Sequence, residues 1–300
     1  MKQLIKPLYR LTHDFLFATS SINPFFNHHH NHKTVIKGFI GDEHLDNPAL
    51  DEKLLSDLKE AGIKTSKHKI NIATYYDYLK KANYPKTYYG GGFEPENNFT
   101  EKTLEHYVTT EFINFKPETV FLDVAACTSP FYKIVKNIFG VRTAYQQDLI
   151  YEKGLQGDKI GGYAHETGLT DNSIDGITLH CSLEHFEDNS DMLFFDEVNR
   201  ILKSGGKAII LPFYFAHTYT IHIDPAFNLL RNHHPEIDNE ADLRYCNWYQ
   251  FHSRHYDVKH LQSRIISQLT DCDITLHLIE NFRDVDQRCY LRWVLEIVRR

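Results

Sequence analysis

Residues 169–213 read LTDNSIDGITLHCSLEHFEDNSDMLFFDEVNRILKSGGKAIILPF: a polar turn, an apolar run, an amphipathic stretch, a Ser-Gly-Gly turn and a second apolar run. Short apolar runs bounded by turn residues predict buried strands over 173–182 and 207–213. The apolar period of 191–203 predicts a helix between them. A strand, a helix and another strand in this order are typical of a parallel sheet.

The same alternation continues on both sides of this stretch. Five strands alternate with helices and a closing hairpin adds two more, so we expect an α/β fold with a mostly parallel seven-stranded sheet and flanking helices. The additional strands are expected at TVFLDVA (119–125), VRTAYQ (141–146), 159–164, ITLHLIE (274–280) and RCYLRWVLEIV (288–298), and helices at 129–139 and 258–269.

The chain divides, on composition, into an N-terminal segment and a larger domain. Residues 1–99 predict a helical and loop segment that covers the pocket, with helices over NPALDEKLLSDLKEAG (47–62) and 72–82. The Pro, Gly and Asn content of 84–100 favours a boundary there, and its Tyr88–Gly92 part is either a hinged lid or a plain linker. The domain then runs over 100–300.

An insertion is expected at 214–255, because this stretch is rich in His, Asn, Asp and Tyr and has no clear period. Its aromatic residues either line a pocket for a fairly large organic acceptor or form a local core. They are Tyr214, Phe215, Tyr219, Tyr245, Trp248 and Tyr249.

Charge and cysteine content narrow the class of protein. With 33 Lys and Arg against 40 Asp and Glu, the net charge of -7 makes nucleic acid an unlikely partner. Five dispersed cysteines without a C-x-x-C pair argue against a disulfide framework or a cysteine zinc site. No apolar stretch is long enough for a membrane span, so we expect a cytoplasmic protein. The run His28–His30 with His32 is interpreted as a solvated loop, because consecutive residues cannot converge on one ion.

The residues that follow each parallel strand are the binding candidates, because ligands bind at the carboxyl ends of the strands. The turn Asp123–Ser129 consists of small residues and has no glycine, which disfavours a dinucleotide and its pyrophosphate. Backbone N–H groups at the start of the next helix suit a ligand with a carboxylate and an amine, such as the methionine half of S-adenosylmethionine. Asp148, after the second strand, is positioned to accept hydrogen bonds from a ribose, although a surface Asp is the plain alternative.

The stretch quoted first resembles the central block of class I S-adenosylmethionine-dependent methyltransferases. In that family a D-N-S-[FI]-D turn, an L-E-H segment and an L-K-[PS]-G-G turn occur in this order, and here they stand at 171–175, 183–186 and 202–206. The likeness extends over 120–213, roughly a third of the chain. It implies a Rossmann-like fold, S-adenosyl-L-methionine as cofactor, and a methyltransferase acting on a small-molecule acceptor.

The resemblance also implies a cofactor site, residue by residue. The family's first motif is D-x-G-x-G-x-G, and Ala125, Cys127 and Ser129 replace its three glycines, while Tyr163 stands where an acidic residue is common. Each replacement adds a β-carbon where the backbone approaches the cofactor. The implied cofactor-binding residues are Tyr89, Asp123, Ala125, Ala126, Cys127, Ser129, Asp148, Ala164, His165, Ser182 and Leu183, with Asp148 on the ribose and Ala164 and His165 beside the adenine.

Glu184 and His185 are the candidate catalytic residues. His185 is a candidate general base for an O or N nucleophile, or the pair only orients its loop. Some relatives use such a Glu-His pair as metal ligands, but here Cys181 stands where a further Glu is expected, and His217 and His222 would have to complete the site, so no metal is predicted. A methyltransferase-like module that has lost turnover with its glycines is the other alternative.

Overall fold

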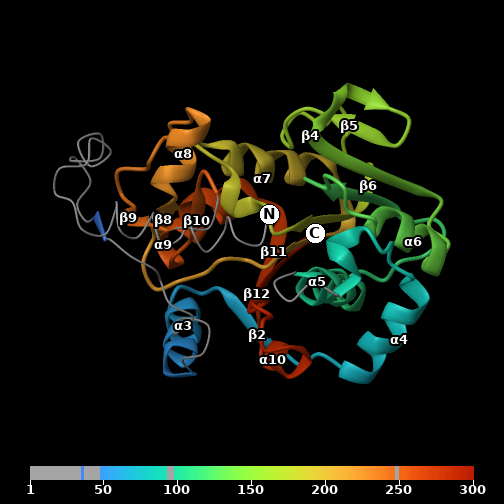
Figure 1. The fold of residues 1–300 in the computed structure, drawn as a ribbon, viewed down its shortest axis with the longest axis horizontal. Coiled ribbons are helices and arrows are strands. Elements are labelled where there is room, and N and C mark those ends of the chain that lie inside the picture. Colours follow the sequence, from blue (N-terminus) through green and yellow to red (C-terminus); the bar gives the residue numbers. More distant parts are fainter. Residues whose placement is uncertain (1–34, 37–47, 93–97, 247–249) are drawn as a thin grey trace. The chain divides into compact units, whose positions relative to one another are not determined.

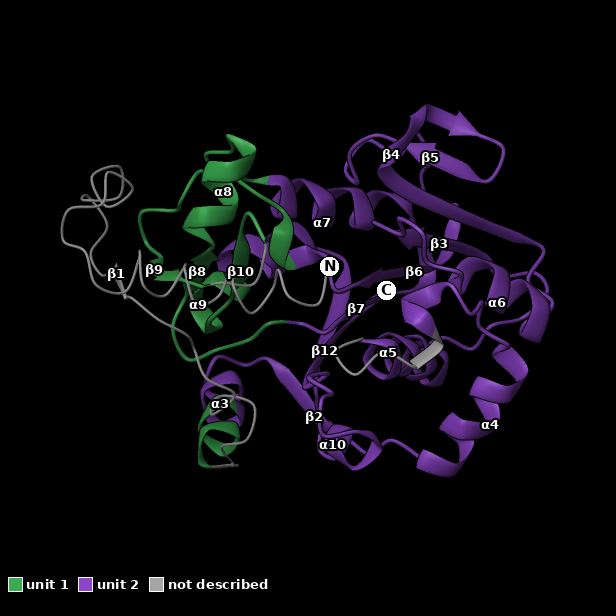
Figure 2. Ribbon diagram, viewed as in Figure 1, with its two compact units in different colours: residues 1–54, 184–189, 214–261 green, residues 55–183, 190–213, 262–300 purple. Residues whose placement is uncertain are grey.

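A computed structural model of the chain describes residues 35–36, 48–92, 98–246 and 250–300. The histidine run 28–32 and the aromatic residues Trp248 and Tyr249 lie outside the described residues. Contacts divide the chain into two compact units (Figure 2): unit 1 comprises 1–54, 184–189 and 214–261, and unit 2 comprises 55–183, 190–213 and 262–300. The predicted border near residue 100 remains a proposal.

Unit 2 is built on an eight-stranded sheet in the order β2-β11-β12-β7-β6-β3-β4-β5 (Figure 1). The central strands β3, β4, β6 and β7 are parallel, whereas β12 is antiparallel to both β7 and β11. This confirms the predicted α/β fold and its mostly parallel sheet. The strands are β2 Lys64–His68, β3 Val120–Val124, β4 Thr143–Gln156, β5 Lys159–Gly161, β6 Ile174–His180, β7 Leu202–Leu211, β11 Cys272–Ile279 and β12 Trp293–Arg299.

Helices cover the sheet because its central strands are apolar on both faces. Leu122, Ile177 and Ile209 in three neighbouring strands are fully buried, as expected for parallel strands with helices on both sides. Helix α5 packs on β6 and β7, α6 on β3 and β4, and α4 on both helices, whereas α7 packs on β7 from the other side (Figure 1). The helices of the chain include α3 Pro48–Glu60, α4 Ile72–Ala82, α5 Phe99–Phe112, α6 Phe131–Phe139, α7 Ser190–Ile201 and α10 Phe282–Val285.

Several element boundaries differ from the sequence prediction for identifiable reasons. The strand expected at 141–146, just before Asp148, continues to Gln156, because the chain turns back on itself and β5 pairs with both halves of β4. The Ser-Gly-Gly turn lies inside β7, where a β-carbon on Gly206 would meet the Lys203 carbonyl oxygen at 2.8 Å. The predicted helix 258–269 is a helical turn followed by π and 3-10 turns. Arg264 in the π turn binds the buried carboxylate of Asp191 with two nitrogens.

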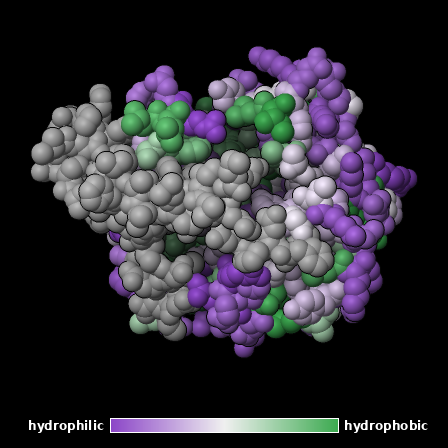
Figure 3. Space-filling view, in the orientation of Figure 1, coloured by the Kyte–Doolittle hydropathy of each residue, from purple (hydrophilic) through white to green (hydrophobic). Residues whose placement is uncertain are grey.

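One strand of this sheet, β2, had no clear sequence signal, whereas β5 lies in the strand expected at 159–164. Strand β2 pairs with β11 as an eighth strand, although its sequence KTSKH is polar and the N-terminal segment was expected to contain only helices and loops. Strand β5 is short and forms the other edge of the sheet. The β4–β5 hairpin next to it exposes Glu152, Lys153 and Lys159, and Figure 3 shows this region as hydrophilic. Charged side chains at a sheet edge hinder pairing with another chain.

Unit 1 contains the predicted insertion, whose strands β8, β9 and β10 form a second, four-stranded sheet with β1 in the order β1-β9-β8-β10. Tyr219, Ile221, Leu243 and Tyr256 are buried in it, so part of the aromatic content serves a local core. Arg254 donates to the carbonyl oxygens of Phe186 and Asp188, which ties 184–189 to this unit. The elements are β1 Val35–Ile36, β8 Thr220–Ile223, α8 Pro225–Arg231, β9 Asp242–Tyr245, β10 Ser253–His255 and α9 Val258–His260.

Candidate functional site

A cavity of about 720 Å³ opens in unit 2 where β3 and β6 end. Its walls come from residues 85–89, the start of α5, the turn 123–130, residues 180–182 and Tyr290. Carboxyl ends of neighbouring parallel strands are the usual ligand position in such sheets. The volume lies within the range of small-molecule pockets, about 300–1,000 Å³.

The turn after β3 adopts the backbone conformation of a glycine-rich loop without glycines. Ala125 has φ of 51° and Cys127 has φ of 47°, both in the left-handed region. L-residues adopt this region at a cost of about 1–2 kcal/mol each. These are the first two of the three positions where the family that the sequence resembles has glycine. The turn therefore has a conformation that favours glycine at two residues that carry a β-carbon.

Hydrogen bonds to β4 hold this strained turn. The N–H groups of Ala125 and Ala126 donate to the side-chain and main-chain oxygens of Gln147, and the N–H of Cys127 donates to Asp148 Oδ2 at 2.7 Å. Asp148 Oδ1 accepts the N–H of Ile150. Three consecutive backbone donors of the turn are therefore directed at β4, and they do not depend on a ligand for their hydrogen bonds.

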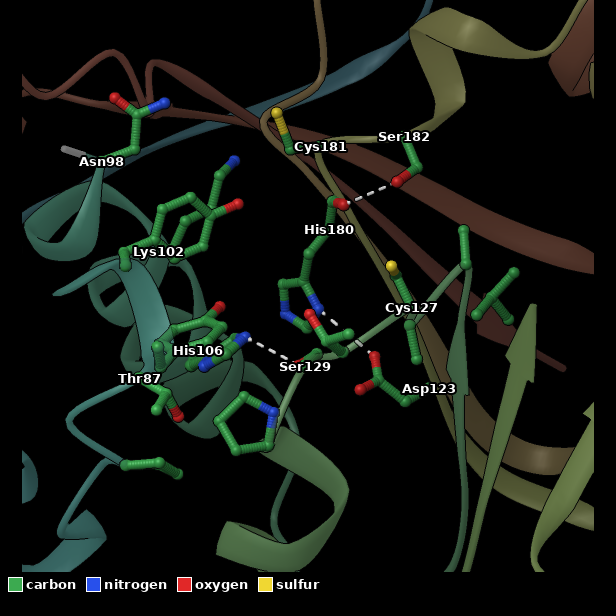
Figure 4. Close-up of a pocket in the computed structure, with 18 of the residues that line it drawn as sticks. Thr87, Asn98, Lys102, His106, Asp123, Cys127, Ser129, His180, Cys181 and Ser182 are labelled. Atoms are coloured by element: carbon green, nitrogen blue, oxygen red, sulfur yellow. Dashed lines mark hydrogen bonds and ion pairs between the residues drawn. The ribbon is translucent and has the colours of Figure 1, made fainter. Parts of the chain in front are cut away.

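Asp123 is the buried acid of the cavity. Its Oδ1 accepts a hydrogen bond from Thr178 Oγ1 at 3.1 Å and lies 3.4 Å from His180 Nδ1. Its Oδ2 is buried and has no hydrogen-bond partner among the residues that the structure describes. A buried carboxylate oxygen without a donor is costly, about 1–3 kcal/mol or more. The side chain borders the cavity (Figure 4), so a donor on a ligand would remove this cost.

Two histidines stand side by side in the cavity wall. The rings of His106 and His180 meet edge to face with centroids 4.8 Å apart. Burial lowers the pKa of His106 well below its usual value, and His180 and Lys102 add to this effect, so His106 is a neutral imidazole. Its two nitrogens lie 2.8 Å from Tyr84 Oη and 3.4 Å from Ser129 Oγ, which links α5 to the turn after β3 (Figure 4).

Helix α5 carries charged residues that are buried. Lys102 Nζ donates to Glu105 Oε1 at 2.7 Å, and the Glu105 side chain is fully inaccessible. Glu101 is 2% exposed and accepts the N–H of Tyr290. Burial raises the pKa of Glu101 to about 8, with Glu105 contributing and Lys102 opposing. At neutral pH Glu101 is therefore mostly protonated, and Glu105 is the carboxylate that balances Lys102.

Tyrosines close the cavity on the side of residues 85–89. Tyr88 stacks on Tyr84 and on His106, and Tyr89 meets Tyr88 edge to face. Tyr89 has φ of 46° and is 42% exposed. The short helix η2 Tyr88–Gly92 thus presents one anchored ring and one accessible ring to the cavity.

The structure brings together seven of the eleven residues predicted to bind the cofactor. Leu183 is a core residue, and Asp148 does not line the cavity but accepts the N–H of Cys127. Ala164 and His165 also do not line the cavity, and the His165 ring stacks on Tyr163. The residues lining the cavity are Tyr89, Asp123, Ala125, Ala126, Cys127, Ser129 and Ser182.

Glu184 and His185 belong to unit 1 and do not line this cavity. Glu184 is buried, and its Oε1 lies 3.5 Å from His185 Nε2. His185 Nδ1 lies 2.6 Å from the carbonyl oxygen of His252, so this nitrogen carries the proton and donates. In the neutral ring the proton-accepting atom is then Nε2.

Sequence reasoning did not identify Lys102, His106, His180 and Tyr290 as cavity residues. Lys102, His106 and Thr109 are spaced at i, i+4 and i+7, which places them on one face of α5. A charged face on a helix ordinarily indicates that this face is exposed to solvent. The stretch 99–112 has no regular apolar stripe, so the sequence did not distinguish a buried face of this helix from an exposed one.

No metal centre is evident within the described ranges, since no group of three or more His, Cys, Asp or Glu side chains is arranged to hold an ion. All five cysteines fall in these ranges and are free thiols. Within the part of the chain that the structure describes, no helix is long and apolar enough to cross a bilayer.

Comparison with known proteins gives a family match over the centre of unit 2. Residues 122–210 match the family model described as a methyltransferase domain, which confirms the family expected from the motifs at 171–175, 183–186 and 202–206. No curated protein matches the sequence significantly.

Solved structures with similar coordinates include three from different organisms. Burkholderia thailandensis 1,6-didemethyltoxoflavin-N1-methyltransferase is 12% identical, with 77% of this chain and 91% of that chain covered and a TM-score of 0.45. The PH0226 protein of Pyrococcus horikoshii is 16% identical, with 75% and 99% covered and a TM-score of 0.43. Haemonchus contortus phosphoethanolamine N-methyltransferase 2 is 13% identical, with 75% and 60% covered and a TM-score of 0.42.

The left-handed turn yields a stability prediction. Ala125→Gly removes the β-carbon strain but makes the unfolded chain more flexible, so it should raise the free energy of unfolding by up to about 1 kcal/mol. Ala126→Gly, at the neighbouring position with ordinary φ, should lower it by about 1 kcal/mol. Urea unfolding of both variants tests this, and equal destabilisation by the two changes would show that the turn is not strained.

The buried Glu101 carboxyl yields a pH prediction. Its pKa is about 8 in the folded chain against 4.5 for the free group, so the folded state binds more protons between these values. Stability must then fall as the pH rises through this window, with a slope of up to about 1.4 kcal/mol per pH unit. The free energy of unfolding of the wild type, relative to that of Glu101→Gln, should fall between pH 4.5 and 8. Above pH 8 the difference between the two proteins should stay constant. A difference that is constant from pH 5 to 9 in thermal unfolding would contradict the assignment.

Proposed function

We propose that this chain, whose residues 122–210 match a methyltransferase domain, transfers a methyl group from S-adenosylmethionine to an O or N nucleophile of a small organic acceptor. The observation that carries the proposal is the turn Asp123–Ser129. Two of its residues, Ala125 and Cys127, have the positive φ that favours glycine, and the turn borders a cavity that contains a buried acid.

The residues present fit this cofactor. Asp123 Oδ2 is a buried acceptor that suits an ammonium group, and the turn 125–129 supplies a wall of small side chains. Tyr89 offers an accessible ring, and Ser182 a hydroxyl, at the same cavity. We assign Asp148 to the ribose hydroxyls and Ala164 and His165 to the adenine, as the resemblance implies, and keep Leu183 as a further candidate contact, although these four residues do not line the cavity.

The bound cofactor would supply a methyl group on a positively charged sulfur, which an electron pair of the acceptor can attack in line. The protein contributes orientation and exclusion of water, which lower the barrier of such a transfer. Tyr84, Tyr88 and His106 form a packed wall that keeps bulk water from that side of the cavity.

A hydroxyl acceptor also has to lose a proton. We propose His185 as the base, accepting the proton at Nε2, with Glu184 beside it to stabilise the resulting cation. The hydrogen bond from Nδ1 to the His252 carbonyl fixes this tautomer.

A second candidate is a cofactor-binding module without turnover. It is favoured by the β-carbons at Ala125, Cys127 and Ser129, where the family has glycine. This candidate predicts occupancy of the cofactor site and no methylated product with any acceptor. The measurements below distinguish the two.

Calorimetry with S-adenosylhomocysteine tests the binding function and the role of Asp148. We expect wild-type protein to bind this product and not NAD, and Asp148→Ala to weaken it at least tenfold, as expected for lost charge-assisted hydrogen bonds. Because Asp148 also holds the Cys127 N–H, the 2′-deoxy analogue is the control. Wild type should bind the analogue more weakly than the parent, and Asp148→Ala should bind both alike. If NAD binds and S-adenosylhomocysteine does not, the proposed function is wrong.

His185→Ala should lower the turnover rate about a hundredfold or more with a hydroxyl acceptor and leave cofactor affinity unchanged. His233→Ala is the matched control, because His233 Nε2 also lies beside a glutamate of unit 1, 2.8 Å from Glu187 Oε1. Turnover is measured as release of S-adenosylhomocysteine across a panel of phenols and amines. Near-normal turnover of His185→Ala would remove the base assignment, and loss of wild-type turnover with a chelator would indicate a metal-assisted reaction instead.

A further inference from the structure

Lys102 is an unusual residue in the wall of the cavity. Among the described residues that line it, Lys102 is the only Lys or Arg, and it is 8% exposed. Burying an ammonium group costs several kcal/mol unless it is paired. The structure meets this cost with Glu105, whose carboxylate lies 2.7 Å from Nζ. An exposed lysine would need no such arrangement, so a positive charge is held at this wall.

The charged groups around Lys102 lie at different depths from the cavity surface. Lys102 reaches the cavity, whereas Glu101 and Glu105 do not line it and are 2% and 0% exposed. The ring of Tyr290 lies 5.4 Å from Nζ, and Asn98 contributes an amide to the same region (Figure 4). An oxygen anion in the cavity would therefore meet the ammonium group before either carboxylate.

The opposite wall does not offer comparable donors. The N–H groups of residues 125–127 donate to Gln147 and Asp148, and the nearby side chain of Asp123 is an acceptor with a buried oxygen. A carboxylate placed against that wall would face Asp123. The cavity thus has an acidic wall at the end of β3 and a basic wall at the start of α5.

We propose that Lys102, assisted by Asn98 and Tyr290, is the anion-binding site of this cavity and that it binds a carboxylate. The site deepens the proposed function and rests on it. The carboxylate can come from two sources, the amino-acid half of the cofactor or an acidic acceptor. Both present the same chemistry to the ammonium group, and binding experiments separate them.

The variants must remove the charge without leaving Glu105 buried alone. Lys102→Met leaves the Glu105 carboxylate without its counter-charge and risks unfolding. The double variant Lys102→Met/Glu105→Gln replaces the ion pair with a neutral pair, and Lys102→Arg retains the charge. Lys133→Met removes one positive charge from the exposed side of α6, away from the cavity lining, and is the matched control.

The probes are pairs that differ in one charged group. S-adenosylhomocysteine and its decarboxylated analogue differ only in the carboxylate, and benzoate and benzamide represent an acidic acceptor and its neutral counterpart. Calorimetry measures the first pair alone and the second pair with saturating S-adenosylhomocysteine. If the cofactor's carboxylate occupies the site, wild type should prefer S-adenosylhomocysteine at least tenfold, or about 1.4 kcal/mol, over the analogue. The double variant should lose this preference, whereas Lys102→Arg and Lys133→Met should keep it.

If the acceptor's carboxylate occupies the site, the double variant should bind S-adenosylhomocysteine as wild type does and should lose the preference for benzoate over benzamide. The proposal is overturned if the folded double variant prefers the carboxylate member of both ligand pairs as strongly as wild type does. It is also overturned if wild type prefers the carboxylate member of neither pair. Those results would leave the proposed function intact as long as wild type binds S-adenosylhomocysteine. Failure of wild type to bind it would overturn the proposed function itself.

Discussion

The site depends on one constraint: β4 accepts three successive backbone N–H groups from the turn after β3. Gln147 and Asp148 are the acceptors; Gln147 is the last residue of β4 that pairs with β3, and Asp148 follows it. Hydrogen bonds of this kind hold Ala125 and Cys127 in the left-handed region in spite of their β-carbons. The turn therefore keeps its shape through its neighbour strand, and the cavity opens beside it.

A second constraint is the burial of α5. Nine consecutive residues of this helix, Glu101 to Thr109, are buried, and they include two acids, a lysine and a histidine. Each of these groups needs a counterpart to be tolerated in the interior. Glu105 pairs with Lys102, His106 is neutral and bonded to Tyr84, and Glu101 takes up a proton more readily than usual. The helix thereby brings polar chemistry to the cavity without a net charge.

The sequence predicted the sheet well because the strands that decide it are simple to recognise. Runs such as 119–125 and 207–213 are mostly apolar, as buried parallel strands are, and each was found as a strand. The edge strand β2 and the strands of unit 1 are polar or rich in histidine and aromatic residues, so no periodicity distinguishes them from loops. Their pairing partners, distant in sequence, determine that they are strands.

The candidate site was predictable where it follows a strand and unpredictable where it lies on a helix. Asp123, Ala125 and Cys127 could be named because their positions relative to β3 assign them to the carboxyl edge of the sheet. Lys102 and His106 could not, since their roles depend on α5 being enclosed by η2, α4 and the sheet. Enclosure is a property of the packed chain, and the same residues on an exposed helix would be solvated.

The turn after β3 keeps a conformation that favours glycine although it contains no glycine. Glycine makes the left-handed conformation inexpensive, whereas here the acceptors on β4 stabilise it from outside at residues with side chains. One consequence is that these N–H groups are engaged before any ligand arrives. Recognition of a negatively charged group then has to come from elsewhere in the cavity wall. Lys102 is the only buried cation among the described residues that line it.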